Sequence, residues 1–272
     1  MAALGEDPFP HVARVKYAKA PLLQVTCQLR FPTILRIESQ PPSEFQERIR
    51  DAFPLLERGA SPFAQGHLPP ELLRTITANF GFNAAGATWN FFSEDKRSWV
   101  SLTTDALSFV TQAYHLWEDF VAQLRVPIEG LIDIYKPPFF TRVGLRYQDL
   151  IVRSKLRLEG VSWSELLKKE ILGEIALKEI EANLQDARRV LRIKTSSGSG
   201  FILLQHGLGV TPGSTEVGYM IDLDFSSEPK TEVSDAWSAL DSLHAGVGRA
   251  FRWCISDRLH DAMEPVPIPD RP

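Results

Sequence analysis

A short motif that occurs twice constrains this chain most strongly. Residues Gln28–Phe31, Gln-Leu-Arg-Phe, are echoed by Gly144–Tyr147, Gly-Leu-Arg-Tyr, so that the two arginines stand 116 positions apart. Each motif is followed by a serine that can begin a helix and, further on, by a tryptophan that opens a long amphipathic segment, Trp117 in one case and Trp237 in the other. We interpret this spacing as a diverged tandem duplication.

The first half contains every element of the expected unit. Between Leu22 and Phe31 apolar and polar side chains alternate, which indicates a strand with one buried face. Pro41-Pro42 precede a capping box at Ser43–Gln46, which predicts a helix to about Glu57. Four alternating runs then predict an antiparallel meander: Leu72–Phe80, Thr88–Phe92, Trp99–Thr103 and Leu107–Thr111. A helix follows from Trp117 to Tyr135, in which Pro127 predicts a kink or a break.

The second half repeats this order. A strand is expected over Phe139–Val152, and a capping box at Ser162–Glu165 predicts a helix to Ile175. A last helix, capped by Ser234, should run from Trp237 to Leu259. Three strands are expected between these helices: Arg189–Lys194, Phe201–His206 and Val217–Phe225.

Each half thus has the order strand, capped helix, meander and long helix. This repeated order favours an α+β fold of the TATA-binding-protein-like or helix-grip-like kind. We assign 1–21 to an N-terminal arm, 22–138 to the first repeat, 139–264 to the second and 265–272 to an extended tail, with the repeats sharing one core. Two alternatives are independent α+β domains divided near Lys136, and a helix-grip fold with one continuous sheet.

Composition narrows the classes of partner. With 44% apolar residues, the 272-residue chain can bury a sizeable core, and its net charge of −4 argues against affinity gained by covering phosphates. Cys27 and Cys254 form neither a metal-binding spacing nor a disulfide framework, so both are expected to be buried. No apolar run is long enough for a membrane span and no signal peptide is visible, so a cytoplasmic protein is expected.

Four arginines mark a candidate binding surface. Arg30 and Arg146 lie on the polar side of equivalent strands, and with Arg142 and Arg192 they predict a basic, exposed sheet face. Such a face suits an acidic protein, a phosphate or the edge of a nucleic acid. The alternative is that each arginine pairs with a carboxylate on a neighbouring strand.

Asp222 and Asp224 are carboxylates of the right kind for that alternative. They alternate on one strand and therefore share a face, where they could also hold Mg²⁺ or Mn²⁺, with His206 the nearest histidine in sequence. A third ligand at a recognisable spacing is missing. We therefore assign no metal, no cofactor and no catalytic residue, and we expect a protein that is not an enzyme while leaving activity open.

Four segments resemble a family of uncharacterised bacterial proteins described as sporadically distributed: 20–32, 114–120, 140–147 and 221–225. The resemblance extends over about 17–264. The family has no assigned activity, so it supplies no catalytic residue. Its patchy occurrence implies an accessory role, such as one on mobile elements or in defence against phage or plasmids.

The leading hypothesis is a non-catalytic binding protein that engages another protein through its sheet face or exposed edges. One alternative is nucleic-acid binding by a basic saddle-shaped face. The other is a small hydrophobic ligand held between the sheet and a long helix. The oligomeric state stays open.

Overall fold

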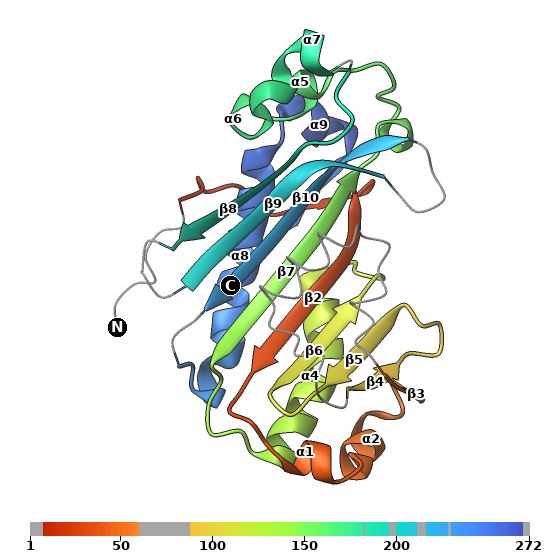
Figure 1. Cartoon of the computed structure of the whole chain (residues 1–272), viewed down its shortest axis with the longest axis vertical. Helices are drawn as coiled ribbons and strands as arrows, with labels where there is room; N and C mark the ends of the chain where they lie inside the picture. Colours follow the sequence, from red (N-terminus) through yellow and green to blue (C-terminus); the bar gives the residue numbers. More distant parts are fainter. Residues whose placement is uncertain are drawn as a thin grey trace. The chain divides into compact units, whose positions relative to one another are not determined.

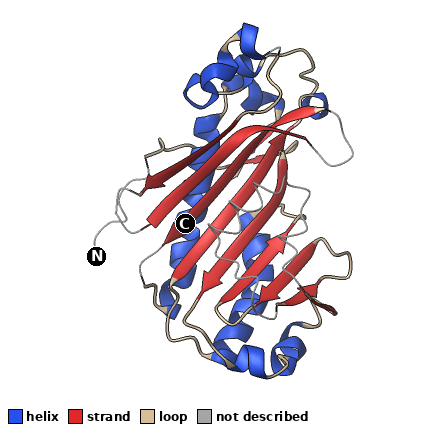
Figure 2. Cartoon of the chain, in the orientation of Figure 1, coloured by secondary structure: helices blue, strands red, loops and turns tan. Residues whose placement is uncertain are grey.

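The computed structural model describes residues 8–59, 88–181, 183–195, 200–210, 216–227 and 230–268. It is of the mixed α+β class, with a large antiparallel sheet and several helices (Figure 2). The chain divides into two compact units, and strands β2 and β7 contribute residues to both. Unit 1 comprises 1–25, 144–229 and 237–272, and unit 2 comprises 26–143 and 230–236. None of the described helices is both long enough and apolar enough to cross a membrane.

In unit 2, a meander of short strands packs on one long helix. Strand order is β3-β4-β5-β6-β2, and the β4–β5 and β5–β6 pairs are antiparallel (Figure 1). The ring centroids of Phe109 on β6 and Phe120 on α4 lie 5.2 Å apart. Its elements are β2 (Leu22–Arg30, from Thr26 on), α1 (Arg36–Ser39), α2 (Ser43–Ile49), β3 (Leu55–Arg58), β4 (Trp89–Phe92), β5 (Ser98–Leu102), β6 (Ala106–Thr111) and α4 (Trp117–Tyr135).

In unit 1, long strands pack on helix α8. Strand order is β2-β7-β10-β9-β8, with β8 and β10 both antiparallel to β9. The main elements are β7 (Arg142–Ile151, from Gly144 on), β8 (Arg188–Lys194), β9 (Gly200–Val210), β10 (Val217–Ser227) and α8 (Ala236–Cys254). Short helices occupy one end of the unit: α5 (Trp163–Leu166), α6 (Lys169–Leu172), α7 (Lys178–Glu181) and α9 (Asp257–Ala262).

The predicted strands and the first long helix are largely confirmed among the described residues. Helix α4 runs without interruption through Pro127, so the predicted break there is wrong. It ends where Lys136 adopts a left-handed conformation with φ of 48°. The predicted strand Leu72–Phe80 lies outside the described residues.

Three helix predictions were wrong in their extent. Helix α2 ends at Ile49, and β3 pairs with β4 where the helix was expected to continue. Ser43 does not act as the N-cap, because that position belongs to Pro42 and no side chain caps the helix. The helix expected after Ser162 is broken into short pieces, one of which ends at Leu172 with Gly173 as its C-cap, at a φ of +53°.

The final helix also divides, because its backbone turns toward a neighbouring segment. Lys168 N donates to Cys254 O at 3.0 Å, and Ser256 N donates to Leu166 O at 2.9 Å. These bonds end α8 at Cys254, and Ser256 then caps α9.

The arm and the tail are not independent extensions. Strands β1 (Val15–Tyr17) and β11 (Pro265–Pro267) form an antiparallel pair in which Val15 lies opposite Pro267. The pair continues into Ala18 N, which donates to Glu264 O at 3.1 Å. The tail is therefore extended as predicted at Pro265–Pro267, and it pairs with the N-terminal arm at Val15–Tyr17.

Candidate functional site

A buried charged pair in unit 1 joins two predicted site residues. Arg146 on β7 donates through Nε to Asp222 Oδ1 on β10 at 2.7 Å, and its Nη2 donates to Oδ2. Gln148 donates to Asp222 Oδ2 at 3.1 Å and accepts from Gln24 Nε2 at 2.7 Å. We call these four residues the β7–β10 network. Its groups satisfy one another within the unit.

The predicted exposed basic face is wrong at Arg146, which is 3% exposed. The physical reason is strand order, since β10 lies beside β7 and brings Asp222 to the guanidinium. Burial opposes the positive charge, but the charge and hydrogen bonds of Asp222 outweigh it and raise the pKa of Arg146. The alternative interpretation, an arginine paired with a carboxylate, describes this geometry.

The two predicted arginines of unit 2 are also engaged internally. Arg142 donates to Gln28 Oε1 at 3.0 Å, and Gln28 Nε2 donates to Ser108 Oγ at 3.3 Å, in a buried chain. Arg30 is half-buried and donates to Asp105 Oδ2 at 3.4 Å. Among the predicted arginines of this unit, Arg142 is therefore buried and Arg30 forms the kind of ion pair considered as the alternative.

The remaining predicted residues lie on neighbouring strands of unit 1. Asp224 is buried and stands opposite Leu203 of β9, which in turn stands opposite Arg192 of β8. The Arg192 guanidinium lies 4.0 Å from the centre of the Phe201 ring. Both oxygens of Asp222 accept hydrogen bonds from Arg146, and no group of three or more His, Cys, Asp or Glu in the described part of the chain could hold a metal.

Sequence reasoning missed a buried acid, Asp149. Burial and, second, the charge of Asp222 raise its pKa to about 8, so it is protonated at neutral pH. A signal was present, because Asp149 falls in the apolar phase of β7, in register with Leu145 and Tyr147. A carboxyl in that phase must be buried neutral or paired.

Three tyrosine–histidine hydrogen bonds lie in the same unit. The hydroxyl–Nδ1 distances are 2.8 Å for Tyr17–His260, 3.0 Å for Tyr147–His244 and 2.8 Å for Tyr219–His206. Burial lowers the pKa of His206 to about 4, with a smaller contribution from Arg189, and burial raises the pKa of Tyr17 to about 12. His206 and Tyr17 therefore stay neutral near pH 7, so they are poor general acids or bases there.

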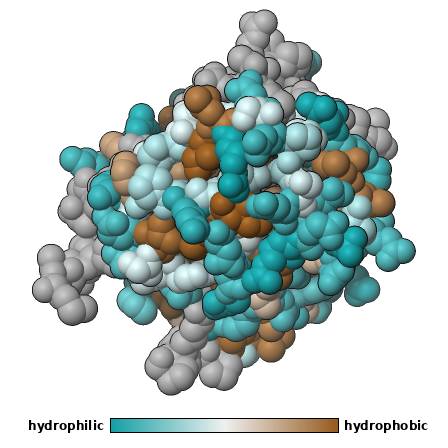
Figure 3. Space-filling model, turned by 90° about the horizontal axis from the view of Figure 1, so that it is seen from below, coloured by the Kyte–Doolittle hydropathy of each residue, from teal (hydrophilic) through white to brown (hydrophobic). Residues whose placement is uncertain are grey.

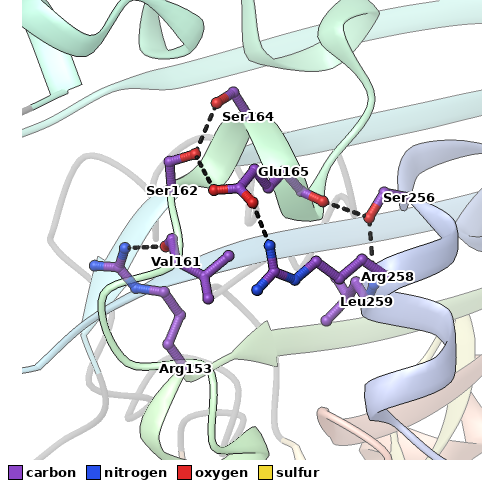
Figure 4. A network of polar contacts seen from close by, with 8 residues as sticks. All are labelled: Arg153, Val161, Ser162, Ser164, Glu165, Ser256, Arg258 and Leu259. Atoms are coloured by element: carbon purple, nitrogen blue, oxygen red, sulfur yellow. Dashed lines mark hydrogen bonds and ion pairs between the residues drawn. The ribbon is translucent and has the colours of Figure 1, made fainter.

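A separate polar network joins α5 to α9 (Figure 4). Glu165 pairs with Arg258, and its carbonyl oxygen accepts from Ser256 Oγ at 2.8 Å. The same Ser256 oxygen accepts from Leu259 N at 3.2 Å as the cap of α9. Each contact has a role in ending or joining helices, so this network is structural.

Among the described strands, β8 is paired along one side of its backbone. Its hydrogen-bonded neighbour among the described strands is β9. Leu208 N donates to Ala187 O at 2.9 Å and Thr195 N donates to Gly200 O at 3.0 Å. Hydrogen-bonded positions alternate in an antiparallel pair, so Arg188, Val190 and Lys194 direct their backbone groups away from β9.

Side-chain exposure agrees with this geometry. Val190 is 52% exposed and Leu191 is 44% exposed, in a strand that carries four cationic residues and no acidic one. Elsewhere, the face drawn in Figure 3 shows small hydrophobic areas separated by hydrophilic residues. We call Arg188–Lys194 the β8 edge.

Comparisons with known proteins identify no family. No protein-family model matches the chain, and no curated protein matches it. A solved structure similar to it is the duplicated taurocyamine kinase from Schistosoma mansoni with bound transition state analog components, at 10% identity and a TM-score of 0.36. That alignment covers 92% of this chain and 36% of the kinase chain, so this chain spans about a third of the kinase's length. A likeness this weak supports no conclusion about activity.

Proposed function

We propose that this chain is a non-catalytic binding protein that engages a partner protein at the β8 edge, in an accessory bacterial system. The observation that carries the proposal is the backbone of β8, which pairs with β9 on one side and directs the N–H and C=O groups of Val190 and its alternate neighbours to the other. An extended segment of a partner can add to such an edge as one more strand.

The edge is a better candidate than the sheet face. On the face, Arg146 and Asp222 bond to each other, and Gln148 bonds to Asp222 and Gln24. A partner that approached these groups would have to break buried bonds at a cost of several kcal/mol. At the edge, a partner would form main-chain hydrogen bonds and cover Val190 and Leu191.

The edge of unit 2 is a weaker candidate. Strand β3 has four residues, and Glu57 within it already pairs with Lys96 at 2.8 Å. Strand β8 has seven residues and so can form a longer ladder.

We also propose that the chain arose by tandem duplication, with a TATA-binding-protein-like or helix-grip-like arrangement. The support is the order of elements. In one half β2 precedes short helices, the strands β3 to β6 and then α4, and in the other β7 precedes short helices, the strands β8 to β10 and then α8. An experimental structure in which 22–138 and 139–264 fail to superpose would contradict this origin.

The binding proposal is tested by changing the backbone of the edge. In Val190→Pro, the lost N–H is one that points away from β9, so the sheet should persist while strand addition is blocked. Val190→Thr is the matched control, because it keeps the N–H and a β-branched side chain.

The measurement is quantitative mass spectrometry of proteins retained from the native host by each immobilised full-length variant. The expected result is a protein retained by the wild type and V190T and lost with V190P, at equal melting temperature. Equal retention by V190P would refute the β8 edge as the binding site.

A further inference from the structure

We infer that unit 1 holds a binding site for a ligand that carries a carboxylate, formed by Arg189 of β8 and His206 of β9 and covered by Glu174. The site is separate from the proposed binding surface, because it uses side chains on one face of the sheet and not the outward backbone groups of the β8 edge. It follows from a buried nitrogen without a partner, from the strand register, and from the ion pair that covers the arginine.

One ring nitrogen of His206 is buried without a hydrogen bond. The side chain is 5% exposed, and its Nδ1 lies 2.8 Å from the hydroxyl oxygen of Tyr219. Nε2 forms no hydrogen bond with any residue in the described part of the chain. Buried polar atoms are nearly always hydrogen-bonded, because an unsatisfied one costs free energy. The Nε2 atom of His206 is therefore a group that a bound ligand would satisfy.

The strand register brings a guanidinium beside this imidazole. Arg189 lies directly opposite His206 in the antiparallel pair of β8 and β9, so the two side chains share one face of the sheet. Burial is the main cause that lowers the pKa of His206, and the positive charge of Arg189 is the second, as expected for neighbouring side chains. Trp163 of α5 packs on the same face, with its ring centroid 5.5 Å from that of Tyr219.

A carboxylate of the chain itself already pairs with this guanidinium. Arg189 pairs with Glu174, whose side chain is 72% exposed. Gly173 precedes it, and a Cβ at that position would overlap the guanidinium, so the backbone there lies directly against Arg189. An ion pair this exposed contributes little to stability. The carboxylate of a ligand can therefore replace that of Glu174 at small cost.

The two binding groups fit a carboxylate better than a phosphate. A guanidinium presents parallel N–H donors that match the two oxygens of a carboxylate. His206 is neutral near pH 7, and when Tyr219 donates to Nδ1 the hydrogen of the imidazole is on Nε2, which then donates to the same ligand. One positive charge faces one negative charge in this arrangement. A phosphate dianion would leave a second negative charge unmatched beside a buried imidazole.

The test uses the full-length protein and three probes: acetate, N-acetylglycine and inorganic phosphate. N-acetylglycine presents its carboxylate as the C-terminus of a peptide does, whereas acetate is a small free acid. Binding is followed by saturation transfer to the methyl protons of acetate and N-acetylglycine, and by the ring nitrogen resonances of His206, at a pH of about 7 and constant ionic strength. Phosphate is measured by its competition with acetate.

The expected result is that acetate binds with a millimolar dissociation constant and shifts the Nε2 resonance of His206. Glu174→Gln should tighten acetate binding by about fivefold, because it removes the competing carboxylate. Arg189→Met should weaken binding by about tenfold or more. His206→Asn, which keeps a hydrogen-bonding partner for Tyr219 but lacks Nε2, should weaken it by about fivefold.

Two control variants separate this site from the other features of β8. Arg188→Met removes the preceding arginine, which lies opposite Gly207 on the other face of the strand and pairs with Asp186. It should leave acetate binding within about twofold of the wild type. V190P, which tests the β8 edge, should also leave acetate binding within about twofold, so failure of the proposed function and failure of the carboxylate site are distinguishable.

The comparison of probes identifies the source of the carboxylate. Tighter binding of N-acetylglycine than of acetate would support the end of a peptide, and the reverse order would support a small free acid. Acetate binding that R189M leaves unchanged, or that E174Q does not tighten, would overturn the site. Phosphate that binds more tightly than both carboxylates would overturn the choice of ligand. An unchanged His206 resonance at about 100 mM acetate would overturn the inference as a whole.

Discussion

Replacement of Asp149 by asparagine should make the protein more resistant to alkaline pH. Asp149 is buried on β7, and burial with the neighbouring charge of Asp222 raises its pKa to about 8. In the unfolded chain the same carboxyl titrates near 3.8. The folded state therefore binds this proton more tightly, so the stability it contributes is fully present below pH 3.8 and is lost as the pH rises through 8.

The size of the expected loss of stability is given for the part of the pH range in which proteins are usually studied. Each pH unit well inside the interval between the two pKa values costs about 1.4 kcal/mol, so raising the pH from 6 to 8 should lower the free energy of unfolding by roughly 2 kcal/mol. Above a pH of about 8 the loss should level off. The amide introduced in D149N is a close isostere of the protonated acid and has no proton to release, so this variant should not show the loss.

The assay is urea unfolding of the wild type and D149N at several pH values from about 6 to about 9, followed by tryptophan fluorescence. The quantity of interest is the difference between the two free energies of unfolding, because the titration of His206 and all other groups is shared and cancels. The difference should grow by roughly 2 to 3 kcal/mol in favour of D149N across this range. A difference that stays constant within about 0.5 kcal/mol would refute a buried, protonated Asp149.

Three further outcomes are expected. Arg146→Met should lower the free energy of unfolding by about 3–5 kcal/mol because it leaves a buried carboxylate unpaired. The double variant R146M/D222L should recover most of this loss in urea unfolding, and additive effects of the two substitutions would contradict the pairing. Gly207→Ala should destabilise strongly, since a Cβ would overlap the carbonyl oxygen of Ala187, whereas G248A in α8 meets open space and should raise the melting temperature slightly. The two cysteines are buried and burial raises the pKa of each to about 12, so a thiol reagent at a pH of about 8 should modify neither until the protein is unfolded, and rapid modification of the native protein would contradict their burial.

Local periodicity was sufficient for most of the long strands and for α4. Alternation in β2 and the three-and-four spacing from Trp117 to Tyr135 depend on neighbours in sequence, and both elements occur where they were predicted. Strand β3 was missed because Leu55–Arg58 shows no alternation, all four residues being exposed. Its strand conformation depends on pairing with β4, which a local pattern does not contain.

The candidate site was harder to predict for the same reason. The residue types at Arg146 and Asp222 were identified, but burial depends on β7 and β10 becoming neighbours, although 76 positions separate the two residues. The exposure of one side of β8 likewise depends on β8 being the last strand in the strand order of the sheet, and the sequence alone does not give that order. Asp149 is the exception, since its phase in β7 could have revealed it.

The pair formed by β1 and β11 sets an order of events during synthesis. Val15 leaves the ribosome early, but its partner Pro267 is translated some 250 residues later, so β1 stays single until nearly all of the described chain has emerged. Formation of the β1–β11 pair is therefore a late step in maturation. Ribosome-bound chains halted before β11 should expose Val15–Tyr17 to proteases that the finished protein resists.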